Sequence, residues 1–280
     1  MAGEHVPGAG PAAGTMVPAM HLTKHHGLGN DFLVLLDLDH TTPIDEDIAR
    51  AVCDRHRGVG ADGLIRVTEG SRHPFRMELR NEDGSRAEMS GNGISCLAQA
   101  LTLAGHAPHG IVQVDTDAGE RTVEVVAAEG PRHHRMRVAM GSPAIKGARE
   151  EWLSPQVLRA VEVDVGNPHV VLHVPDPRDA PDLEGIGRAV NDSTPGGTNV
   201  ELVSPGDDGA IVMSVYERGV GPTEACGTGA VAAAVAANAW GLAGATVRVV
   251  QPGGPVTVEL GAVAHLTVPV VAVASVEWPL

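Results

Sequence analysis

Short apolar stretches rich in β-branched residues recur along most of the chain, each bounded by turn residues. Such stretches predict strands, because alternation with a period of two is typical of half-buried strands. They cover residues 21–26, 32–37, 75–80, 111–116, 121–127, 135–140, 160–165, 169–174, 199–203, 210–217, 245–250, 255–260 and 263–276. Helical spacing is rarer and predicts an amphipathic helix over 46–56 and short helical segments over 152–158 and 180–190.

Two apolar stretches of a different kind follow glycine-rich turns. Residues 94–104 and 230–240 contain no charged side chain, and each stretch ends at a glycine, Gly105 or Gly241. Glycine is the usual residue just past a helix end. A helix that is apolar around its whole circumference must be surrounded by protein. Each predicted helix is about 18 Å long, which suits the centre of a curled sheet and is too short for a bilayer.

The same design therefore occurs twice. Ser90 precedes Gly91-Asn92-Gly93 and the first apolar helix, and Cys226 precedes Gly227-Thr228-Gly229 and the second. We expect an α+β fold of two pseudo-symmetric lobes, each a curved β-sheet or barrel wrapped around one buried central helix. If the two helix starts face each other, Ser90 and Cys226 flank one substrate carbon, which is the geometry for moving a proton across it.

The chain length of 280 residues fits two domains, each large enough to bury its own core. We expect an N-terminal lobe over 20–137, with a returning strand at 268–280, and a C-terminal lobe over 138–267. Residues 1–19 are rich in Gly, Pro and Ala and lack the basic and unbroken apolar regions of a signal peptide. They are predicted to be a disordered extension.

The net charge and the number of cysteines indicate which partners and which cellular compartment to expect. Lys and Arg number 20 against 35 Asp and Glu, a formal charge of −15, so nucleic acid is not an expected partner. Three cysteines, Cys53, Cys96 and Cys226, do not form a disulfide framework and favour a reducing compartment. No stretch reaches the ~18 apolar residues of a membrane span. We expect a soluble cytoplasmic protein with no membrane partner.

The two predicted helix starts are suited to acid–base chemistry. The first turn of a helix carries unpaired N–H groups and about half a positive charge, which binds anions and favours a thiolate. Cys226 is therefore expected to have a pKa below the ~8.5 of a free thiol and to act as a base. A substrate carboxylate would lie between the helix starts. The alternative stays open that Ser90 is an ordinary N-cap and Cys226 inert core filler.

Several ordered motifs identify a family. They are His26-Gly27-Leu28-Gly29-Asn30-Asp31-Phe32, Arg57-Gly58-Val59-Gly60-Ala61-Asp62-Gly63, Asn81-Glu82-Asp83-Gly84-Ser85 with Gly91-Asn92-Gly93, Gly166-Asn167-Pro168-His169, Thr198-Asn199-Val200-Glu201, and Tyr216-Glu217-Arg218-Gly219 with Ala225-Cys226-Gly227-Thr228-Gly229-Ala230. In this order they resemble the diaminopimelate epimerases, which interconvert LL- and meso-diaminopimelate without a cofactor. The resemblance implies the same two-lobed fold, with the final strand returning to the first lobe.

The resemblance also implies roles for individual residues. The positions that match catalytic groups are Cys226, Ser90, Glu217 and His169. Those that match substrate-binding groups are Asn30, Asn81, Gly91, Asn92, Asn167, Asn199, Glu217, Arg218, Gly227 and Thr228. The asparagines and Arg218 match positions that hold the distal end and carboxylates of the substrate, and the helix-start amides match a carboxylate cradle. The resemblance implies an amino-acid substrate, no cofactor, no metal ion and a possible homodimer.

One departure bears directly on the chemistry. Family members carry cysteine at both helix starts, whereas position 90 of this chain is serine, and a hydroxyl is ionised far less than a thiol at neutral pH. Ser95 stands where arginine is common in the family, and Gly63 where some members have glutamine.

Three interpretations of Ser90 stay open. The chain is an epimerase impaired by serine, a natural Ser/Cys epimerase in which Glu88 or water assists Ser90, or a Ser/Cys racemase or dehydratase acting on another amino acid such as a hydroxyproline. A protein of another class, an inactive homologue that binds an amino acid, is a further alternative.

Overall fold

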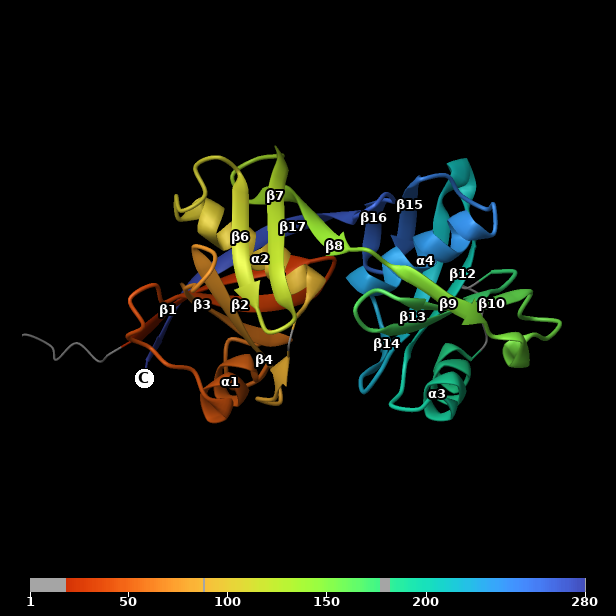
Figure 1. The fold of residues 1–280 in the computed structure, drawn as a ribbon. Coiled ribbons are helices and arrows are strands. Elements are labelled where there is room, and N and C mark those ends of the chain that lie inside the picture. The colour runs from red at the N-terminus through yellow and green to blue at the C-terminus, as the bar shows by residue number, and fades with distance from the viewer. Residues whose placement is uncertain (1–18, 88, 177–181, 280) are drawn as a thin grey trace, which may run out of the picture.

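The computed structural model describes residues 19–87, 89–176 and 182–279. Two lobes lie side by side, each built of strands around one helix (Figure 1). This arrangement confirms the α+β class expected from the sequence. The extension predicted over 1–19 lies outside the described residues, except for Ala19, which begins the first strand. Glu88, a proposed assistant of Ser90, also lies outside them.

The N-terminal lobe is a closed ring of strands around helix α2 (Gly91–Leu103). The ring runs through β1 (Ala19–Gly27), β2 (Asn30–Leu36), β3 (Gly63–Glu69), β4 (Phe75–Asn81), β6 (Ile111–Thr116), β7 (Gly119–Ala128), β8 (His133–Gly141) and β17 (Ala264–Pro279), which pairs with β1. A short strand, β5 (Arg86–Ala87), pairs with β4. Helix α1 (Glu46–Cys53) packs outside the ring over a separate small core.

The C-terminal lobe repeats this plan around helix α4 (Gly227–Ala239). Its strands are β9 (Ala144–Ala148), β10 (Arg159–Asp164), β11 (Pro168–His173), β12 (Asn199–Pro205), β13 (Ile211–Glu217), β15 (Thr246–Gln251), β16 (Gly254–Glu259) and the first residues of β17. The short β14 (Gly221–Thr223) pairs with β13, and α3 (Leu183–Ser193) packs outside. Two short 3-10 turns span Glu150–Trp152 and Asp207–Gly209.

Strand β17 belongs to both lobes. Residues 265–267 pair with β16, residues 264–271 pair with β8 on the other side, and residues 270–279 pair with β1, where Gly27 lies opposite Val270 and Ala19 opposite Pro279. The C-terminus therefore lies in the N-terminal lobe (Figure 1). A second link between the lobes is the segment from β8 into β9, which passes Gly141. The boundaries proposed at residues 137 and 267 stay predictions.

The two central helices are buried along most of their length, as their composition predicts. Both begin three residues before the apolar stretch, because the glycine turn itself forms the first helical turn. The side chains of Ser90 and Cys226 cap these turns. Alanine dominates α4, so the surrounding strands approach its backbone closely and form one continuous apolar core with α2.

Some elements differ from the prediction. Strand β3 was not predicted because Arg66 interrupts its apolar pattern, but the Arg66 guanidinium pairs with the buried carboxylate of Asp37. The short helix expected over 152–158 is wrong, since the chain there forms the 3-10 turn Glu150–Trp152 followed by a bridge between Ser154 and Val157. Pro155 lies within this bridge and lacks the N–H that a helix interior needs.

Candidate active site

The starts of α2 and α4 face each other at the junction of the lobes. A Cβ added to Gly91 would lie 3.9 Å from the Gly227 Cα, and one added to Gly227 would lie 3.8 Å from the Gly91 Cα. The absence of side chains at both positions leaves the space between the two helix starts open. The structure therefore brings Gly91 and Gly227 together, with Ser90 and Cys226 immediately before them.

Ser90 and Cys226 have the same local geometry. Both are N-caps in extended backbone, and each side chain accepts a hydrogen bond from the third helical residue, at 3.0 Å from Gly93 N to Ser90 Oγ and 3.4 Å from Gly229 N to Cys226 Sγ. The first two N–H groups of each helix precede the intrahelical bonds. Two pairs of amides are thus available to bind an anion such as a carboxylate.

Burial dominates the electrostatics of Cys226. The residue is 6% exposed, and burial raises the pKa of the thiol well above its ordinary value, with Glu217 and Glu201 adding to the rise. The Thr228 hydroxyl and the Gly229 N–H act in the opposite direction and are outweighed. The sequence-based expectation of a lowered pKa is therefore wrong for this structure, because the helix start was weighed without burial and neighbouring carboxylates.

Glu217 lies at the end of β13 beside Cys226. The Thr223 hydroxyl donates to its Oε1 at 2.6 Å. Burial raises the pKa of the Glu217 carboxyl, while hydrogen bonds from Thr223 and Cys226 limit the rise. A carboxyl group with a raised pKa in contact with a thiol is suited to exchange a proton with it.

His169 is completely buried at the start of β11 and has a partner at each ring nitrogen. Its Nδ1 lies 2.7 Å from Glu201 Oε1, and its Nε2 lies 3.0 Å from Asn167 Oδ1. Asn167 Nδ2 in turn donates to Thr228 Oγ1 at 3.4 Å. Of the predicted site residues, Asn167, His169, Thr228 and Cys226 are therefore connected.

A second group of predicted residues lies on the N-terminal side. Asn92 Nδ2 donates to Asn30 Oδ1 at 3.3 Å, and Asn30 Nδ2 donates to Asp62 Oδ2 at 2.7 Å. Asp62 Oδ1 also pairs with Arg55. The carboxylate of Asp62 therefore fixes the amide of Asn30 next to the start of α2.

The remaining predicted binding residues also lie at strand ends: Asn81 ends β4, Asn199 begins β12 and Arg218 follows β13. Asn199 uses its amide internally, because Oδ1 accepts from Arg218 N at 3.0 Å and Nδ2 donates to Pro168 O at 3.2 Å. The exposed Arg218 guanidinium donates to Gly196 O at 3.2 Å. Asn81, also exposed, donates to Ser85 Oγ at 3.0 Å. Their substrate-binding roles stay predictions.

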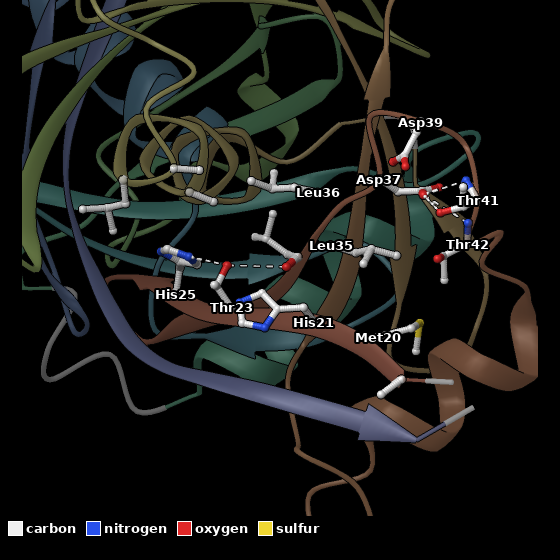
Figure 2. A pocket seen from close by; sticks show the side chains of 15 residues that line it. Met20, His21, Thr23, His25, Leu35, Leu36, Asp37, Asp39, Thr41 and Thr42 are labelled. Carbon is white, nitrogen blue, oxygen red and sulfur yellow. Dashed lines mark hydrogen bonds between the residues drawn. The ribbon is translucent and has the colours of Figure 1, made fainter. Parts of the chain in front are cut away.

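A separate cavity of about 400 Å³ lies near the opposite end of α2. Figure 2 shows Asp37 in its wall with hydrogen bonds to Thr41 and Thr42, and the other oxygen of Asp37 accepts from Arg66. The wall also contains His25, which is held by Gln99. None of the predicted site residues lines this cavity. We therefore place the chemistry at the helix starts.

Three residues near the site were not among the predicted ones. Glu201 contacts His169, Asp62 holds Asn30, and Gln251 Oε1 accepts the Cys226 N–H at 2.8 Å. Glu201 carries a usable signal, since it is an acidic residue within an otherwise apolar strand. The pairing of Gln251 with residue 226 leaves no mark in the sequence.

Within the described part of the chain, no three or more His, Cys, Asp or Glu side chains group so as to hold a metal ion. No helix among these residues is long and apolar enough to cross a membrane.

Comparisons with known proteins agree with one another. A family model described as diaminopimelate epimerase matches residues 22–146 and 161–274. The diaminopimelate epimerases of Desulfitobacterium hafniense and Corynebacterium glutamicum are each 39% identical to the chain. The first alignment covers 86% of this chain and 91% of the relative, and the second covers 85% and 90%.

Solved structures share the fold at low identity. A phenazine biosynthesis protein of Bacillus anthracis has a TM-score of 0.71 at 17% identity and covers 94% of this chain and 100% of its own. A hydroxyproline epimerase of Agrobacterium vitis has a TM-score of 0.67 at 16% identity and covers 92% and 90%. At such identities the likeness concerns the fold alone.

Proposed function

The chain belongs to the diaminopimelate epimerase family, and on this premise we propose that it is an isomerase that interconverts LL- and meso-2,6-diaminopimelate. The reaction removes the α-proton from one face of a stereocentre and returns a proton to the other. Such a reaction serves lysine and peptidoglycan biosynthesis.

The facing helix starts are the observation that carries this proposal. They present Ser90 and Cys226 as equivalent caps on two helices whose first glycines touch. A substrate carboxylate bound by the free amides of both helices would set its α-carbon between the two caps. The same amides would stabilise the negative charge that forms when the α-proton leaves.

Cys226 and Glu217 supply the proton chemistry on one face. The thiol of Cys226 transfers its proton to the Glu217 carboxylate, and the resulting thiolate accepts the α-proton of the substrate. The buried Glu217 suits this task because its pKa is raised toward neutrality. On the opposite face Ser90 donates its hydroxyl proton to the substrate carbanion, and exchange with solvent then returns a proton to the Ser90 oxygen and removes one from Glu217. Since a hydroxyl is a weaker acid than a thiol, this second transfer limits the rate.

The test is incubation with LL-diaminopimelate in heavy water. The enzyme is expected to incorporate deuterium at the α-carbon and to form the meso isomer, and Cys226→Ala is expected to lose both activities. Cys53→Ala is the matched control, because this cysteine lies in α1, apart from the site. Retained exchange in Cys226→Ala would refute the assignment of the base.

The same incubation, repeated with a hydroxyproline as the substrate, separates the alternatives. Loss of water from a hydroxyproline would identify a dehydratase, and racemisation of that substrate another Ser/Cys enzyme. Binding of diaminopimelate without exchange would identify an inactive homologue. The likeness to a hydroxyproline epimerase does not favour the first two, because it rests on 16% identity.

We also infer a homodimer and a cytoplasmic location. The family resemblance supports the dimer, and so do two exposed apolar side chains, Leu103 and Val273, which line a shallow depression on the N-terminal lobe. Sedimentation equilibrium of the full chain gives the oligomeric state. A monomer at all concentrations would contradict the dimer.

A further inference from the structure

In each lobe, two parallel strands pack against the first turn of the central helix, next to Ser90 in one lobe and Cys226 in the other. Residues at matching positions on these strands can therefore be compared. In the N-terminal lobe, β2 and β3 run parallel with Phe32 opposite Gly63; in the C-terminal lobe, β11 and β12 run parallel with His169 opposite Asn199. Counting from these pairs, His169 corresponds to Phe32, and Glu201 corresponds to Ile65. The side chains behind the serine are thus apolar, and those behind the cysteine are ionisable.

The contacts at the helix starts confirm this correspondence. A Cβ added to Gly93 would meet Ile65 Cδ1 at 3.3 Å, whereas one added to Gly229 would meet Glu201 Oε1 at 2.7 Å. The same position at Gly229 is 3.3 Å from Cys226 Sγ. The carboxylate of Glu201 therefore lies against the first turn of α4, behind the cysteine.

Burying the Glu201 carboxylate lowers the stability of the fold, so packing does not explain why a glutamate stands there. Its side chain is completely buried in a strand whose neighbours Val200 and Leu202 are apolar and buried. One carboxylate oxygen contacts His169, and the other, Oε2, has no hydrogen-bond partner within the described residues. An isoleucine fills the equivalent place in the other lobe without this penalty.

Glu201 reaches Cys226 through a chain of polar contacts. From Glu201 it passes to His169 Nδ1 at 2.7 Å and from His169 Nε2 to Asn167 Oδ1 at 3.0 Å. It continues from Asn167 Nδ2 to Thr228 Oγ1 at 3.4 Å and from there to Cys226 Sγ at 3.5 Å. Carboxylate and amide oxygens only accept hydrogen bonds, so His169 donates from Nδ1 to Glu201 and from Nε2 to Asn167 Oδ1, and these two bonds orient the ring.

We propose that Glu201 is a positioning residue for the reaction: its buried carboxylate holds the Nδ1 proton of His169 and thereby orients His169, Asn167 and Thr228 toward Cys226. Ionisable side chains thus lie next to Cys226, whereas the corresponding positions next to Ser90 are the apolar Ile65 and Phe32. This role rests on the proposed function. The N–H position on His169 does not, and it is measured without substrate.

Glu201→Leu removes the acceptor and imitates the apolar residue of the other lobe. We expect kcat for α-proton exchange to fall at least about tenfold, with KM within about threefold because Glu201 is buried away from the surface. The thermal midpoint stays within about 4 °C. Glu201→Gln, which keeps an oxygen acceptor, is expected to lose less activity. In nitrogen-15 spectra, the Nδ1-bound proton of His169 is present in the wild type and Glu201→Gln and lost in Glu201→Leu.

Asp37→Asn is the matched control. It alters another buried carboxylate at the far end of α2, and it is expected to lower the thermal midpoint while kcat is unchanged. The double variant His169→Phe with Glu201→Ile reproduces the pair of the N-terminal lobe and is expected to fold but to lack activity.

Unchanged kcat in a folded Glu201→Leu, or an unchanged Nδ1 proton, would overturn the proposal. Activity lost only in proportion to unfolded protein would also overturn it. If the wild type shows no exchange while the Nδ1 proton depends on Glu201, the proposed function fails and the positioning of His169 stands.

Discussion

Ser90 and Cys226 occupy equivalent positions at the two helix starts, and one atom distinguishes their side chains. The surrounding backbone is the same, since both are extended N-caps over a glycine-rich first turn. The difference in function therefore comes from the acidity of the hydroxyl and from the groups behind each cap. Thiol and hydroxyl make the two faces of the site chemically unequal.

Ser90→Cys tests which face limits the reaction. We expect inversion to rise by about 100-fold, because a thiol is a better acid than a hydroxyl in the return of the proton. Chiral chromatography of the product measures the rate. Ser90→Ala is the comparison, expected to keep exchange by Cys226 and to lose inversion. An unchanged rate in Ser90→Cys would instead indicate a natural Ser/Cys mechanism.

The ionisation of Cys226 gives a pH prediction. Because burial raises the pKa of this thiol well above its ordinary value, the group is protonated at neutral pH, and its thiolate appears only at alkaline pH. Ultraviolet thiolate absorbance, taken as the difference between wild type and Cys226→Ser, checks this. A difference signal already complete at pH 7 would contradict the raised pKa.

Much of the candidate site was predictable from residues that are close in sequence. Within each copy of the motif the cap and its glycines are neighbours in sequence, so their proximity follows from the helix itself. Glu201 stood out only as an acidic residue between apolar neighbours, and Gln251 gave no signal, because their contacts with His169 and Cys226 join separate strands. The pKa of Cys226 was misjudged for the same reason: burial depends on the whole fold.

At the scale of elements, local pattern predicted the central helices and most strands. The prediction failed where long-range contacts decide the structure. Strand β3 carries Arg66, which a local pattern assigns to solvent, but Asp37, directly after the neighbouring strand β2, neutralises it within the fold. The edge strand β9 is exposed at most positions and therefore lacks the apolar alternation that predicts strands.

The meeting of α2 and α4 makes a prediction at this scale. In Gly91→Ala the added methyl group would have ordinary contacts with Gly227 and Met140, so the fold is expected to tolerate it. It would occupy the space proposed for the substrate carboxylate, and KM is expected to rise about tenfold or more, equivalent to about 1.4 kcal/mol. Steady-state kinetics and thermal unfolding measure the two effects.

Gly147→Ala is the matched control for Gly91→Ala. Gly147 lies in β9 with open space around the added methyl group, so both KM and stability are expected to change little. A KM for Gly91→Ala as low as that of this control would show that the carboxylate does not bind between the helices.

At the scale of the molecule, the lobes share a strand and an apolar core. Strand β17 pairs with β16 in one lobe and with β8 and β1 in the other, and residues of both lobes form one buried cluster. The pseudo-symmetry was visible in the duplicated motif, whereas the sharing of a core was not, because it depends on how the lobes are joined.

This shared strand predicts cooperative unfolding. When β17 detaches, both lobes lose the strand that it contributes to them. Both lobes are therefore expected to unfold in a single thermal transition. Scanning calorimetry checks this by comparing the van't Hoff enthalpy with the calorimetric enthalpy, whose ratio is expected to be about 1. Two separate transitions would show that the lobes are independent.

The connections between the lobes also determine how the molecule opens. Both covalent links, β17 near Ala264 and the passage from β8 to β9 at Gly141, lie together, since these two residues are paired. The two lobes are therefore joined along one paired segment. The turn at Leu28 and Gly29 rests against Gly253 and Glu224 of the other lobe, so any rotation of the lobes about the paired links would separate this contact.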